Sequence, residues 1–410
     1  MSATPVIVIH YHELWLKGRN RRFFLGKLLV AVRRALEDLP IKRLHQPGDR
    51  LLVELDEGVP FDLAIERLQR VFGIAYFAVA RPVARRIEEI TEAAWEEVAP
   101  EAFTTFAVRA KRSDKSFPLR AAEIERQVGR VLLDRLRAAG RGVRVHLNDP
   151  ELTCRIEITA GPALVYARKL PGPGGMPANT AGRVLCLLSG GFDSAVAAYK
   201  MMRRGAHVCF VHYYGAGAQP GESSLHVARE LVRKLVPYQF TARLYLVPFE
   251  SIQREIVQCA PENYRVLLYR RLMLRISERL ARRERALGLV TGDSLAQVAS
   301  QTLHNMAAVD AGSSLSIFRP LVGEDKLEIL ALARRIGTYD ISAEPFHDCC
   351  PAFLPRVPVL HTRPEELDEA ERTLDVQALV GRGVETAQLE RYRWRAGRVE
   401  QVASLRSANA

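Results

Sequence analysis

The segment Ser-Gly-Gly-Phe-Asp-Ser, residues 189–194, constrains the fold of this chain more than any other part of its sequence. It follows an apolar run at residues 183–188 that is typical of a buried strand, and it precedes residues 194–204, whose apolar side chains recur at helical spacing. Adjacent glycines permit a positive φ and a close approach of backbone N–H groups to an anion, and a helix N-terminus attracts negative charge. The segment therefore predicts a phosphate-binding loop between a strand and a helix. An ordinary glycine-rich turn is the alternative.

The chain after residue 182 predicts an α/β domain with a doubly wound parallel sheet, because short apolar strands alternate with longer helices. The phosphate loop follows the first of these strands, at the carboxyl edge where such sheets bind ligands. It lacks the Lys-Ser/Thr ending of the Walker phosphate loop. The predicted strands are Val184–Leu188, Val208–Tyr213, Leu244–Val247, Gly288–Thr291 and Ser316–Phe318.

The N-terminal half predicts a different architecture, since strand and helix patterns mix there as they do in α+β proteins. Residues 1–60 predict a strand, a helix and a strand, and residues 61–170 repeat mixed signals. The prolines and glycines in residues 171–181 indicate a linker. Residues 182–364 hold the parallel-sheet domain, and residues 365–410 are expected to form a charged, helix-prone C-terminal extension with a frayed end.

The 410-residue chain is basic, with a formal net charge of +12, which favours a polyanionic partner such as nucleic acid or an acidic membrane surface. A solvated, merely basic surface is the alternative. No apolar run approaches the roughly 18 residues of a membrane span. The run Val6–Ile9 is too short for a signal peptide, and the few cysteines suit a reducing compartment, so a cytoplasmic location is expected. The basic residues that suit contacts to an RNA phosphate backbone are Lys17, Arg19, Arg21, Arg22, Lys111, Arg112 and Lys115.

Three further features of the sequence are candidates for binding a nucleotide or for acting on its phosphates. Asp193 lies inside the phosphate loop, where a carboxylate suits a Mg²⁺ ion bridging phosphates or the orientation of a reacting group. An acidic residue that merely stabilises the helix dipole is the alternative. A second glycine turn, residues 291–302, is expected to form the opposite wall of a nucleotide crevice. Lys326 is expected to neutralise charge on a transferring phosphate, unless it is a solvated surface residue.

Cys349 and Cys350 are adjacent in a polar segment, which makes a thiolate nucleophile or a sulfur carrier the expected role. Two idle thiols are the alternative. The pair and the nearby His347 do not make up the four ligands of a zinc site. An iron–sulfur cluster would need a further thiolate, for which Cys259 is the candidate. No resident metal site is therefore predicted, and Mg²⁺ is expected to bind together with the phosphates of the nucleotide.

Taken in their order along the chain, these motifs resemble those of the ThiI family of tRNA 4-thiouridine synthetases, and the resemblance extends over residues 5 to 360. Lys-Gly-Arg-Asn-Arg at residues 17–21 resembles the start of the family's ferredoxin-like domain, and residues 111–118 resemble part of its THUMP RNA-binding domain. Residues 187–194 resemble the PP-loop of enzymes that split ATP into AMP and pyrophosphate. The resemblance implies ferredoxin-like and THUMP domains followed by a PP-loop ATP pyrophosphatase domain. Further matches to that last domain are residues 291–301 and 319–326.

The resemblance implies a two-step reaction. ATP with Mg²⁺ adenylates the C4 oxygen of uridine 8 in tRNA, and a persulfide sulfur then displaces AMP to give 4-thiouridine. Asp193 and Lys326 would be essential to activation, and either Cys349 or Cys350 would be the family's catalytic cysteine, because both positions fit the family pattern. The basic N-terminal surface would hold tRNA across a homodimer. The residues implied to contact ATP are Leu187, Leu188, Ser189, Gly190, Gly191, Ser194, His212, Tyr213, Arg270, Gly292 and Gln301.

Many members of the family carry a C-terminal rhodanese domain whose cysteine bears the persulfide, and this chain is expected to have none. Sulfur would then come from a cysteine desulfurase, a separate sulfur carrier or free sulfide. Two alternatives stay open. Another PP-loop enzyme would adenylate an RNA base and deliver an amine, which needs neither thiol. An RNA-binding module whose nucleotide domain is only a scaffold would release no pyrophosphate.

Overall fold

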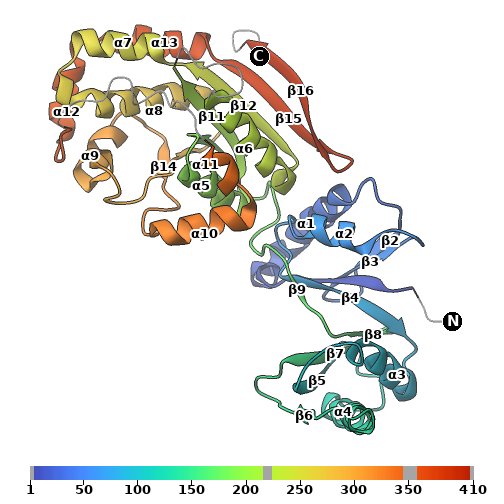
Figure 1. The fold of residues 1–410 in the computed structure, drawn as a ribbon. Coiled ribbons are helices and arrows are strands. Elements are labelled where there is room, and N and C mark those ends of the chain that lie inside the picture. The colour runs from blue at the N-terminus through green and yellow to red at the C-terminus, as the bar shows by residue number, and fades with distance from the viewer. Residues whose placement is uncertain (1–3, 216–223, 345–357, 407–410) are drawn as a thin grey trace. The chain divides into compact units, whose positions relative to one another are not determined.

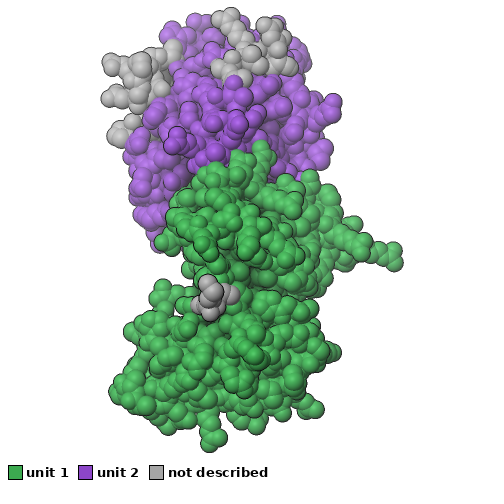
Figure 2. Space-filling model, turned by 90° about the vertical axis from the view of Figure 1, so that its right-hand side faces the viewer, with its two compact units in different colours: residues 1–175 green, residues 176–410 purple. Residues whose placement is uncertain are grey.

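The computed structural model describes residues 4–215, 224–344 and 358–406 of the chain (Figure 1). The chain forms two compact units, residues 1–175 and 176–410, which Figure 2 distinguishes by colour. Each unit has its own sheet. The predicted catalytic cysteines, Cys349 and Cys350, lie outside the described residues.

Within the described residues, unit 1 (residues 1–175) contains a nine-stranded sheet and five helical segments. Its strands are β1 (Val6–His10), β2 (Ile41–His45), β3 (Leu51–Leu55), β4 (Tyr76–Val83), β5 (Thr105–Arg112), β6 (Arg144–Val145), β7 (Leu152–Ile158), β8 (Ala163–Tyr166) and β9 (Leu170–Pro171). Its helical segments are η1 (Glu13–Asn20), α1 (Arg21–Ala35), α2 (Phe61–Leu68), α3 (Ile87–Val98) and α4 (Ala121–Ala138).

The sheet of unit 1 has the strand order β2-β3-β1-β4-β8-β7-β5-β6, with β9 paired to β4. Strand β4 belongs to both halves of this sheet, because it pairs with β1 along its first residues and with β8 along its last. The long helix α4 packs on the second half through Ile124, Val128, Leu132 and Leu136, which recur every four residues on one buried face. One continuous strand thus joins the first half of the unit to the second.

The prediction of strand, helix and strand for residues 1–60 omitted β2 and was incomplete. Strand β2 lies at the edge of the sheet, paired with β3 alone. Its sequence Ile-Lys-Arg-Leu-His has two exposed basic residues in the middle and no fully buried position. An edge strand of this kind lacks the apolar alternation that identifies a half-buried strand.

A buried ion-pair cluster lies inside unit 1, around Glu157 of β7. Glu157 is 3% exposed and forms ion pairs with the fully buried Arg50 and with His10, whose Nε2 lies 2.8 Å from Glu157 Oε1. The hydroxyl of Tyr166 donates to the same carboxylate at 2.6 Å. Burial opposes ionisation of Glu157, but the hydrogen bond and charge of His10 and the charge of Arg50 hold the pKa of this carboxyl below its usual range. Glu157 is therefore a charged group whose removal would leave Arg50 buried with less compensation.

We expect Glu157→Gln to lower the free energy of unfolding of unit 1 by about 3 kcal/mol, because breaking a buried ion pair leaves an uncompensated charge. Amide hydrogen exchange of the full chain, followed at β1 and β7, measures this loss. The matched control is Glu54→Gln, which removes a partly exposed partner of His45 at 3.7 Å and is expected to cost less than about 1 kcal/mol. Equal protection of β1 and β7 in all three proteins would contradict the expectation.

The same carboxylate makes the stability of unit 1 depend on pH. Since the folded-state pKa of Glu157 is lowered, its contribution is fully present above the unfolded-state pKa of about 4.3 and is lost as the pH falls through the folded value. The wild-type chain is therefore expected to lose protection in unit 1 below about pH 4 more steeply than Glu157→Gln.

Unit 2 (residues 176–410) contains a seven-stranded sheet within the described residues. Its strands are β10 (Arg183–Leu187), β11 (His207–Tyr214), β12 (Thr241–Pro248), β13 (Gly288–Val290), β14 (Ser316–Phe318), β15 (Gln388–Arg395) and β16 (Arg398–Arg406). Its helical segments are α5 (Phe192–Arg203), α6 (Ser224–Gln239), α7 (Glu250–Cys259), η2 (Glu262–Tyr264), α8 (Arg265–Arg283), η3 (Ala299–Gln301), α9 (Leu303–Asp310), α10 (Lys326–Ile336), α11 (Tyr339–Ala343), α12 (Pro364–Glu371) and α13 (Val376–Glu385).

The predicted parallel sheet is confirmed in unit 2. The strand order is β14-β13-β10-β11-β12-β15-β16, and the first five strands pair in parallel. The chain runs outward from β10 through β11 to β12 and then returns to the other side of β10 with β13. The order therefore reverses between β10 and β13, and a crevice at such a switch point is the usual ligand site of an open α/β sheet.

The expectation that residues 365–410 are helix-prone was wrong for residues 388–406. Strand β15 pairs antiparallel with β12, and β16 pairs antiparallel with β15, so this segment extends the sheet (Figure 1). Ala396 and Gly397 form the turn between them and have φ of 47° and 78°, the positive values typical of a two-residue hairpin turn. Arginines, which are good helix formers, alternate here with the buried Tyr392 and Trp394 and hide a strand pattern.

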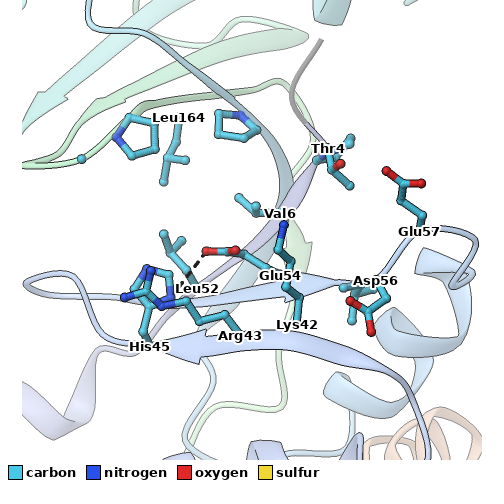
Figure 3. A pocket seen from close by; sticks show the side chains of 15 residues that line it. Thr4, Val6, Lys42, Arg43, His45, Leu52, Glu54, Asp56, Glu57 and Leu164 are labelled. Atoms are coloured by element: carbon cyan, nitrogen blue, oxygen red, sulfur yellow. Dashed lines mark ion pairs between the residues drawn. The ribbon is translucent and has the colours of Figure 1, made fainter. Parts of the chain in front are cut away.

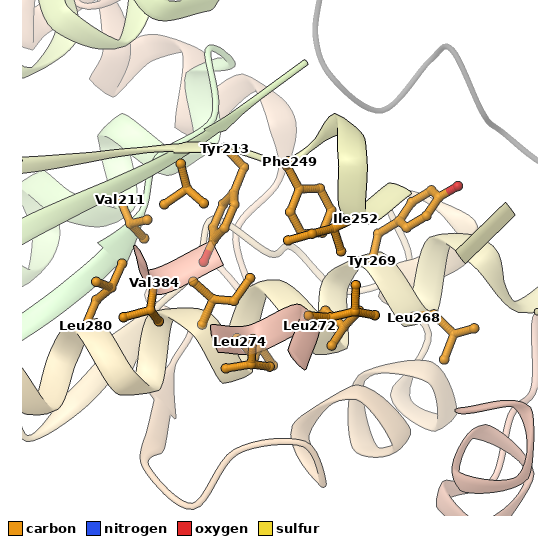
Figure 4. Close-up of a cluster of buried hydrophobic side chains, with 14 of the residues drawn as sticks. Val211, Tyr213, Phe249, Ile252, Leu268, Tyr269, Leu272, Leu274, Leu280 and Val384 are labelled. Atoms are coloured by element: carbon orange, nitrogen blue, oxygen red, sulfur yellow. The ribbon is translucent and has the colours of Figure 1, made fainter. Parts of the chain in front are cut away.

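The main core of unit 2 lies between the sheet and α8 (Figure 4). Val211 and Tyr213 of β11 face Leu274 and Leu280 of α8, and Val384 of α13 closes the cluster. The Tyr213 hydroxyl donates to the backbone carbonyl of Met273 at 2.7 Å, which satisfies the one polar group of that side chain. This core fixes α8 beside the carboxyl edge of β10.

Candidate nucleotide site

The glycine-rich loop joins the carboxyl end of β10 to the N-terminus of α5. Ser194 closes the loop, because its buried hydroxyl accepts the backbone N–H of Ser189 at 3.0 Å and lies 3.2 Å from the Ser189 carbonyl. Gly191 is the N-cap residue of α5 and brings no side chain to cap the helix. The first turn of α5 therefore points uncapped N–H groups at the loop, which is the arrangement that binds phosphate.

The second glycine turn lies directly against this loop. A β-carbon at Gly292 would lie 2.6 Å from the backbone nitrogen of Ser194 and 2.8 Å from the carbonyl carbon of Asp193. Both atoms belong to the backbone of α5, so they cannot move aside as a flexible side chain would. Gly292 follows β13, the neighbour of β10 at the switch point. The structure thus brings together the two turns that the sequence predicted to form a nucleotide crevice.

Asp193 and Lys326 meet although they are 133 residues apart in the sequence. Lys326 Nζ donates to Asp193 Oδ1 at 2.6 Å, and Gln297 Nε2 donates to Asp193 Oδ2 at 3.3 Å. Lys326 is the first residue of α10, whose N-cap Asp325 forms a capping box with Glu328. The cap holds the start of α10, and with it Lys326, beside the loop. A carboxylate and an ammonium here suit a metal-bound phosphate and its leaving group.

A buried carboxylate that the sequence analysis did not single out organises the opposite wall. Asp293, 5% exposed, accepts hydrogen bonds from Arg270 Nη2 at 2.5 Å and from Arg319 Nε at 3.2 Å. The Thr291 hydroxyl and the Gln301 amide also donate to it, at 2.8 and 3.2 Å. Burial opposes ionisation, but the Arg270 charge, the Thr291 hydroxyl and the Arg319 charge hold the pKa of this carboxyl below its usual range. The only signal for Asp293 in the sequence was its position directly after Gly292, the glycine of the second turn.

Asp193 and Asp293, with the arginine partners of Asp293, line a pocket of about 210 Å³, and Lys326 lies beside this pocket through its contact with Asp193. Met273, Leu274 and Val309 give it an apolar part, which suits the flat face of a base, while Arg270 and Arg319 bring positive charge. The sequence-predicted residues that line the pocket are Leu187, Ser189, Asp193, Ser194, Arg270, Gly292 and Gln301.

Five residues implied to contact ATP are not in the pocket lining. Two of them, Gly190 and Gly191, belong to the phosphate loop itself, and the other three are buried in the protein. His212 is buried, with Nδ1 2.8 Å from the Leu188 carbonyl oxygen and Nε2 3.0 Å from Ser224 Oγ. Leu188 is itself buried, and Tyr213 belongs to the core (Figure 4). These contacts let His212 hold the start of the phosphate loop and give Tyr213 a packing role.

The described thiols do not reach the pocket. Cys259 is exposed at the end of α7 and does not line it. The remaining described thiols are buried, and burial raises the pKa of each to about 12. They stay protonated at neutral pH and are poor nucleophiles. These buried residues are Cys154, Cys186 and Cys209.

The basic residues predicted to contact RNA differ in how far their charges are already compensated. Lys111 forms an ion pair with Asp49 at 2.5 Å. Arg112 donates to the backbone carbonyls of Lys115 and Phe117, at 2.6 and 2.9 Å, and so holds its own loop. Lys115 is exposed. Of the second predicted cluster, Lys115 is therefore the residue best placed for a phosphate.

The basic residues of η1 and α1 lie beside aromatic rings. The Arg21 guanidinium lies 3.3 Å from the ring centroid of Trp15, and Lys17 Nζ lies 5.2 Å from that of Phe24. Trp15 and Phe23 are each about half exposed. Exposed rings among cations suit an RNA-binding surface, because bases stack on the rings while the cations bind phosphates. The other predicted residues of this stretch, both exposed, are Arg19 and Arg22.

A larger pocket of about 650 Å³ lies in unit 1 (Figure 3). Two basic residues, Lys42 and Arg43, and three acidic residues, Glu54, Asp56 and Glu57, line it. Glu54 forms an ion pair with His45, shown as a dashed line in Figure 3. The pocket of unit 2 suits a phosphate better, because it lies against the phosphate loop and the uncapped N-terminus of α5.

In the part of the chain that the structure describes, none of the helices has the length and apolar character needed to cross a membrane. None of the groups of three or more His, Cys, Asp or Glu side chains in the same part is arranged to hold a metal ion.

The chain matches three family models in order along its sequence. These are the ThiI ferredoxin-like domain at residues 6–78, the THUMP domain at residues 84–168 and the thiamine biosynthesis protein ThiI at residues 179–376. The last range contains both glycine turns and every residue that lines the pocket.

Curated relatives resemble the chain over nearly its whole length. A probable tRNA sulfurtransferase of Thermus thermophilus is 43% identical over 391 residues, which cover 95% of each chain. One of Moorella thermoacetica is 39% identical over 383 residues, covering 93% of this chain and 96% of the relative.

Solved structures resemble it as well. A 4-thiouridine synthetase in complex with RNA and bound ATP has a TM-score of 0.83 at 28% identity, covering 95% of this chain and 100% of that one. The protein PH1313 of Pyrococcus horikoshii has a TM-score of 0.61 at 26% identity, covering 81% and 99%. With its family models in order and relatives matched end to end, the chain belongs to the ThiI family of tRNA sulfurtransferases.

Proposed function

We propose that this chain is an ATP-dependent tRNA sulfurtransferase that converts uridine 8 of tRNA to 4-thiouridine. The observation that carries the proposal is the meeting of Asp193, Lys326 and the uncapped N-terminus of α5 beside one pocket. The relatives named as tRNA sulfurtransferases and the similar structure that holds RNA and ATP support tRNA and ATP as the substrates.

The first step activates the uridine. Its C4 oxygen attacks the α-phosphorus of ATP, the bond from that phosphorus to the pyrophosphate breaks, and pyrophosphate leaves. The N–H groups of α5 and the Lys326 ammonium are placed to stabilise the charge that develops on the pyrophosphate. Arg270 and Arg319, both held by Asp293, add two cations on the opposite wall. The uridine oxygen, a poor leaving group, is thereby converted into part of AMP.

The donor groups of the pocket fit a Mg²⁺ ion that arrives with the ATP phosphates. Of the two carboxylates in the lining, Asp293 accepts hydrogen bonds from four side chains and Asp193 from two, Lys326 and Gln297, so Asp193 is the candidate ligand. One carboxylate together with phosphate oxygens is the usual ligand set of Mg²⁺ in nucleotide sites. When bound, the ion would supply charge neutralisation at the phosphates.

The second step replaces oxygen by sulfur. A persulfide sulfur attacks C4, the bond from C4 to its oxygen breaks, and AMP leaves. The persulfide S–S bond must then be cleaved by a thiolate, for which we propose Cys349 or Cys350, and an external thiol reduces the resulting disulfide. We propose a separate sulfur-carrying protein, such as a cysteine desulfurase, as the source of the persulfide.

The reaction is tested with purified protein, unmodified tRNA, Mg-ATP, cysteine, a cysteine desulfurase and dithiothreitol. The digested tRNA is expected to contain 4-thiouridine by mass spectrometry, dependent on ATP and on the desulfurase. Pyrophosphate release without 4-thiouridine would mean that activation works and that the donor is wrong. Release of neither product by folded protein would overturn the proposal. The homodimer implied by the family and the cytoplasmic location expected from the sequence stay predictions, and sedimentation of the full chain checks the first.

Cysteine variants separate the two steps. We expect Cys349→Ser or Cys350→Ser to abolish 4-thiouridine formation while pyrophosphate release stays within about twofold of wild type, since a serine hydroxyl cannot cleave a persulfide. The matched control is Cys259→Ser, which removes an exposed thiol outside the pocket and is expected to change neither product. Full thiolation by the Cys349→Ser, Cys350→Ser double variant would favour another nucleophile, and base modification by an amine would favour the alternative PP-loop chemistry.

A further inference from the structure

The amino edge of the sheet in unit 2, opposite the edge that carries the ATP pocket, holds an open groove of about 1,010 Å³. The first residues of β10, β11 and β12 line it, together with the end of α8 and part of β15. No Asp or Glu is among its lining residues. Six arginines line this basic groove: Arg183, Arg243, Arg283, Arg285, Arg391 and Arg393.

Glu284 lies close to these arginines, but its carboxylate already forms hydrogen bonds within the protein. Glu284 is buried and accepts hydrogen bonds from Arg243 Nη1 at 2.6 and 2.8 Å and from the Tyr245 hydroxyl at 2.7 Å. Arg183 Nη1 lies 3.4 Å from the same carboxylate. The single negative charge of Glu284 thus lies beside the positive charges of Arg243 and Arg183, so the net charge of these three side chains is positive.

The C-terminal hairpin adds two more arginines to the groove, Arg391 and Arg393. Arg391 lies directly opposite Arg243 in the pairing of β15 with β12, a register in which like charges repel. The Nε atom of Arg391 is buried and has no hydrogen-bond partner. Arg393 lies opposite Glu400 of β16. Among the residues that the structure describes, none forms an ion pair with Arg391, Arg393 or Arg285.

A histidine in the groove is affected by the same positive charge. Burial, followed by the charges of Arg183 and Arg243, lowers the pKa of His207 to about 4, against the opposing effect of Glu284. The ring is therefore neutral at physiological pH, with Nδ1 2.7 Å from Asn179 Oδ1. The groove disfavours an additional cation, as expected of a site for anions.

We propose that the basic groove binds the phosphodiester backbone of RNA, as a contact surface for tRNA on unit 2. The inference rests on the proposed function, which makes tRNA the polyanionic substrate. Arginine forks pair with phosphate oxygens through two parallel hydrogen bonds, and arginines that form no ion pair within the protein can bind a backbone regardless of base sequence. The inference also assigns a role to β15 and β16, for which the sequence offered no motif.

The experiment compares tRNA binding by the full chain at 50 to 200 mM KCl. The test variant carries Arg285→Gln and Arg393→Gln, two exposed side chains outside the ATP pocket, so folding and the activation chemistry are preserved. The control variant also loses two positive charges, through Arg363→Gln and Arg372→Gln. These arginines are the N-cap and C-cap residues of the acidic helix α12, and each already pairs with a glutamate. Dissociation constants come from fluorescence anisotropy of labelled, unmodified tRNA.

The test variant is expected to bind tRNA about tenfold more weakly at 100 mM KCl, with a salt slope reduced by about 1 to 2, because each lost phosphate contact lowers that slope by nearly one. The control is expected to match wild type. An unchanged slope and affinity in the test variant would overturn the inference while the proposed function stands. Loss of desulfurase-dependent thiolation with tRNA binding intact would overturn it in favour of an acidic protein partner. A wild-type chain that fails to bind tRNA would overturn the proposed function itself.

Discussion

Lys326→Ala is expected to lower tRNA-dependent pyrophosphate release by about 10²- to 10³-fold, the usual effect of removing one group that stabilises transition-state charge. Lys326 Nζ lies 2.6 Å from Asp193 Oδ1, beside the N-terminus of α5, where the pyrophosphate charge is expected to develop. The measurement is pyrophosphate release at saturating ATP and tRNA. Because the charge is needed most in the transition state, kcat should fall more than KM for ATP rises.

A second lysine provides the matched control for this variant. Lys200 lies on α5, as Asp193 does, and pairs with Glu324, which does not line the pocket, whereas Lys326 pairs with Asp193, which does. Lys200→Ala removes an ion pair at the protein surface and is expected to change pyrophosphate release by less than about twofold. Comparable losses in Lys200→Ala and Lys326→Ala would point to a general effect of charge or stability and would contradict the role given to Lys326.

Gly292→Ala is expected to lower ATP-dependent activity by at least about 10²-fold, because displacing reacting groups by ~1 Å has effects of that size. The added methyl group would lie 2.6 Å from the backbone nitrogen of Ser194, so the two loops that form the pocket must separate. Overpacking at this contact is also expected to lower the free energy of unfolding of unit 2 by about 1–3 kcal/mol. ATP binding by calorimetry and hydrogen exchange at α5 measure the two effects.

Gly323→Ala is the control for the effect of a methyl group at a nearby glycine. A β-carbon at Gly323 would meet nothing within 4 Å, and its φ is not positive, so the substitution is expected to leave ATP binding unchanged. Normal ATP binding by Gly292→Ala would show that the two loops can move apart freely. It would remove the structural basis for the nucleotide site at this contact.

Several features of the fold could be predicted from sequence because they depend on neighbours along the chain. Adjacent glycines between an apolar run and a helical pattern predicted the loop between β10 and α5. Strands alternating with helices predicted the parallel sheet of unit 2, and the order of the motifs identified the family. The hairpin of residues 388–406 was missed because its alternation is carried by arginines, whose usual preference is helical.

The composition of the site depended on contacts between distant segments. Asp293 has no motif of its own, and its importance appears only when Arg270 of α8 and Arg319 after β14 converge on it. His212 and Tyr213 are consecutive residues of β11, and successive side chains of a strand point to opposite faces of the sheet. One therefore holds the phosphate loop and the other packs in the core.

The sequence by itself determined the local backbone: where a strand ends, where glycines permit a tight loop and where a helix begins. These are properties of a few consecutive residues, and they were enough to identify a phosphate loop and a family. Only the tertiary structure decided which charges share a site, since Lys326 reaches Asp193 across 133 residues through the strand order of the sheet. The same order places Arg391 opposite Arg243 and creates the basic groove. The sequence does not show which charged side chains will lie close together. Tertiary packing decides this, and it therefore decides whether a charged side chain forms an ion pair within the protein or can bind a ligand.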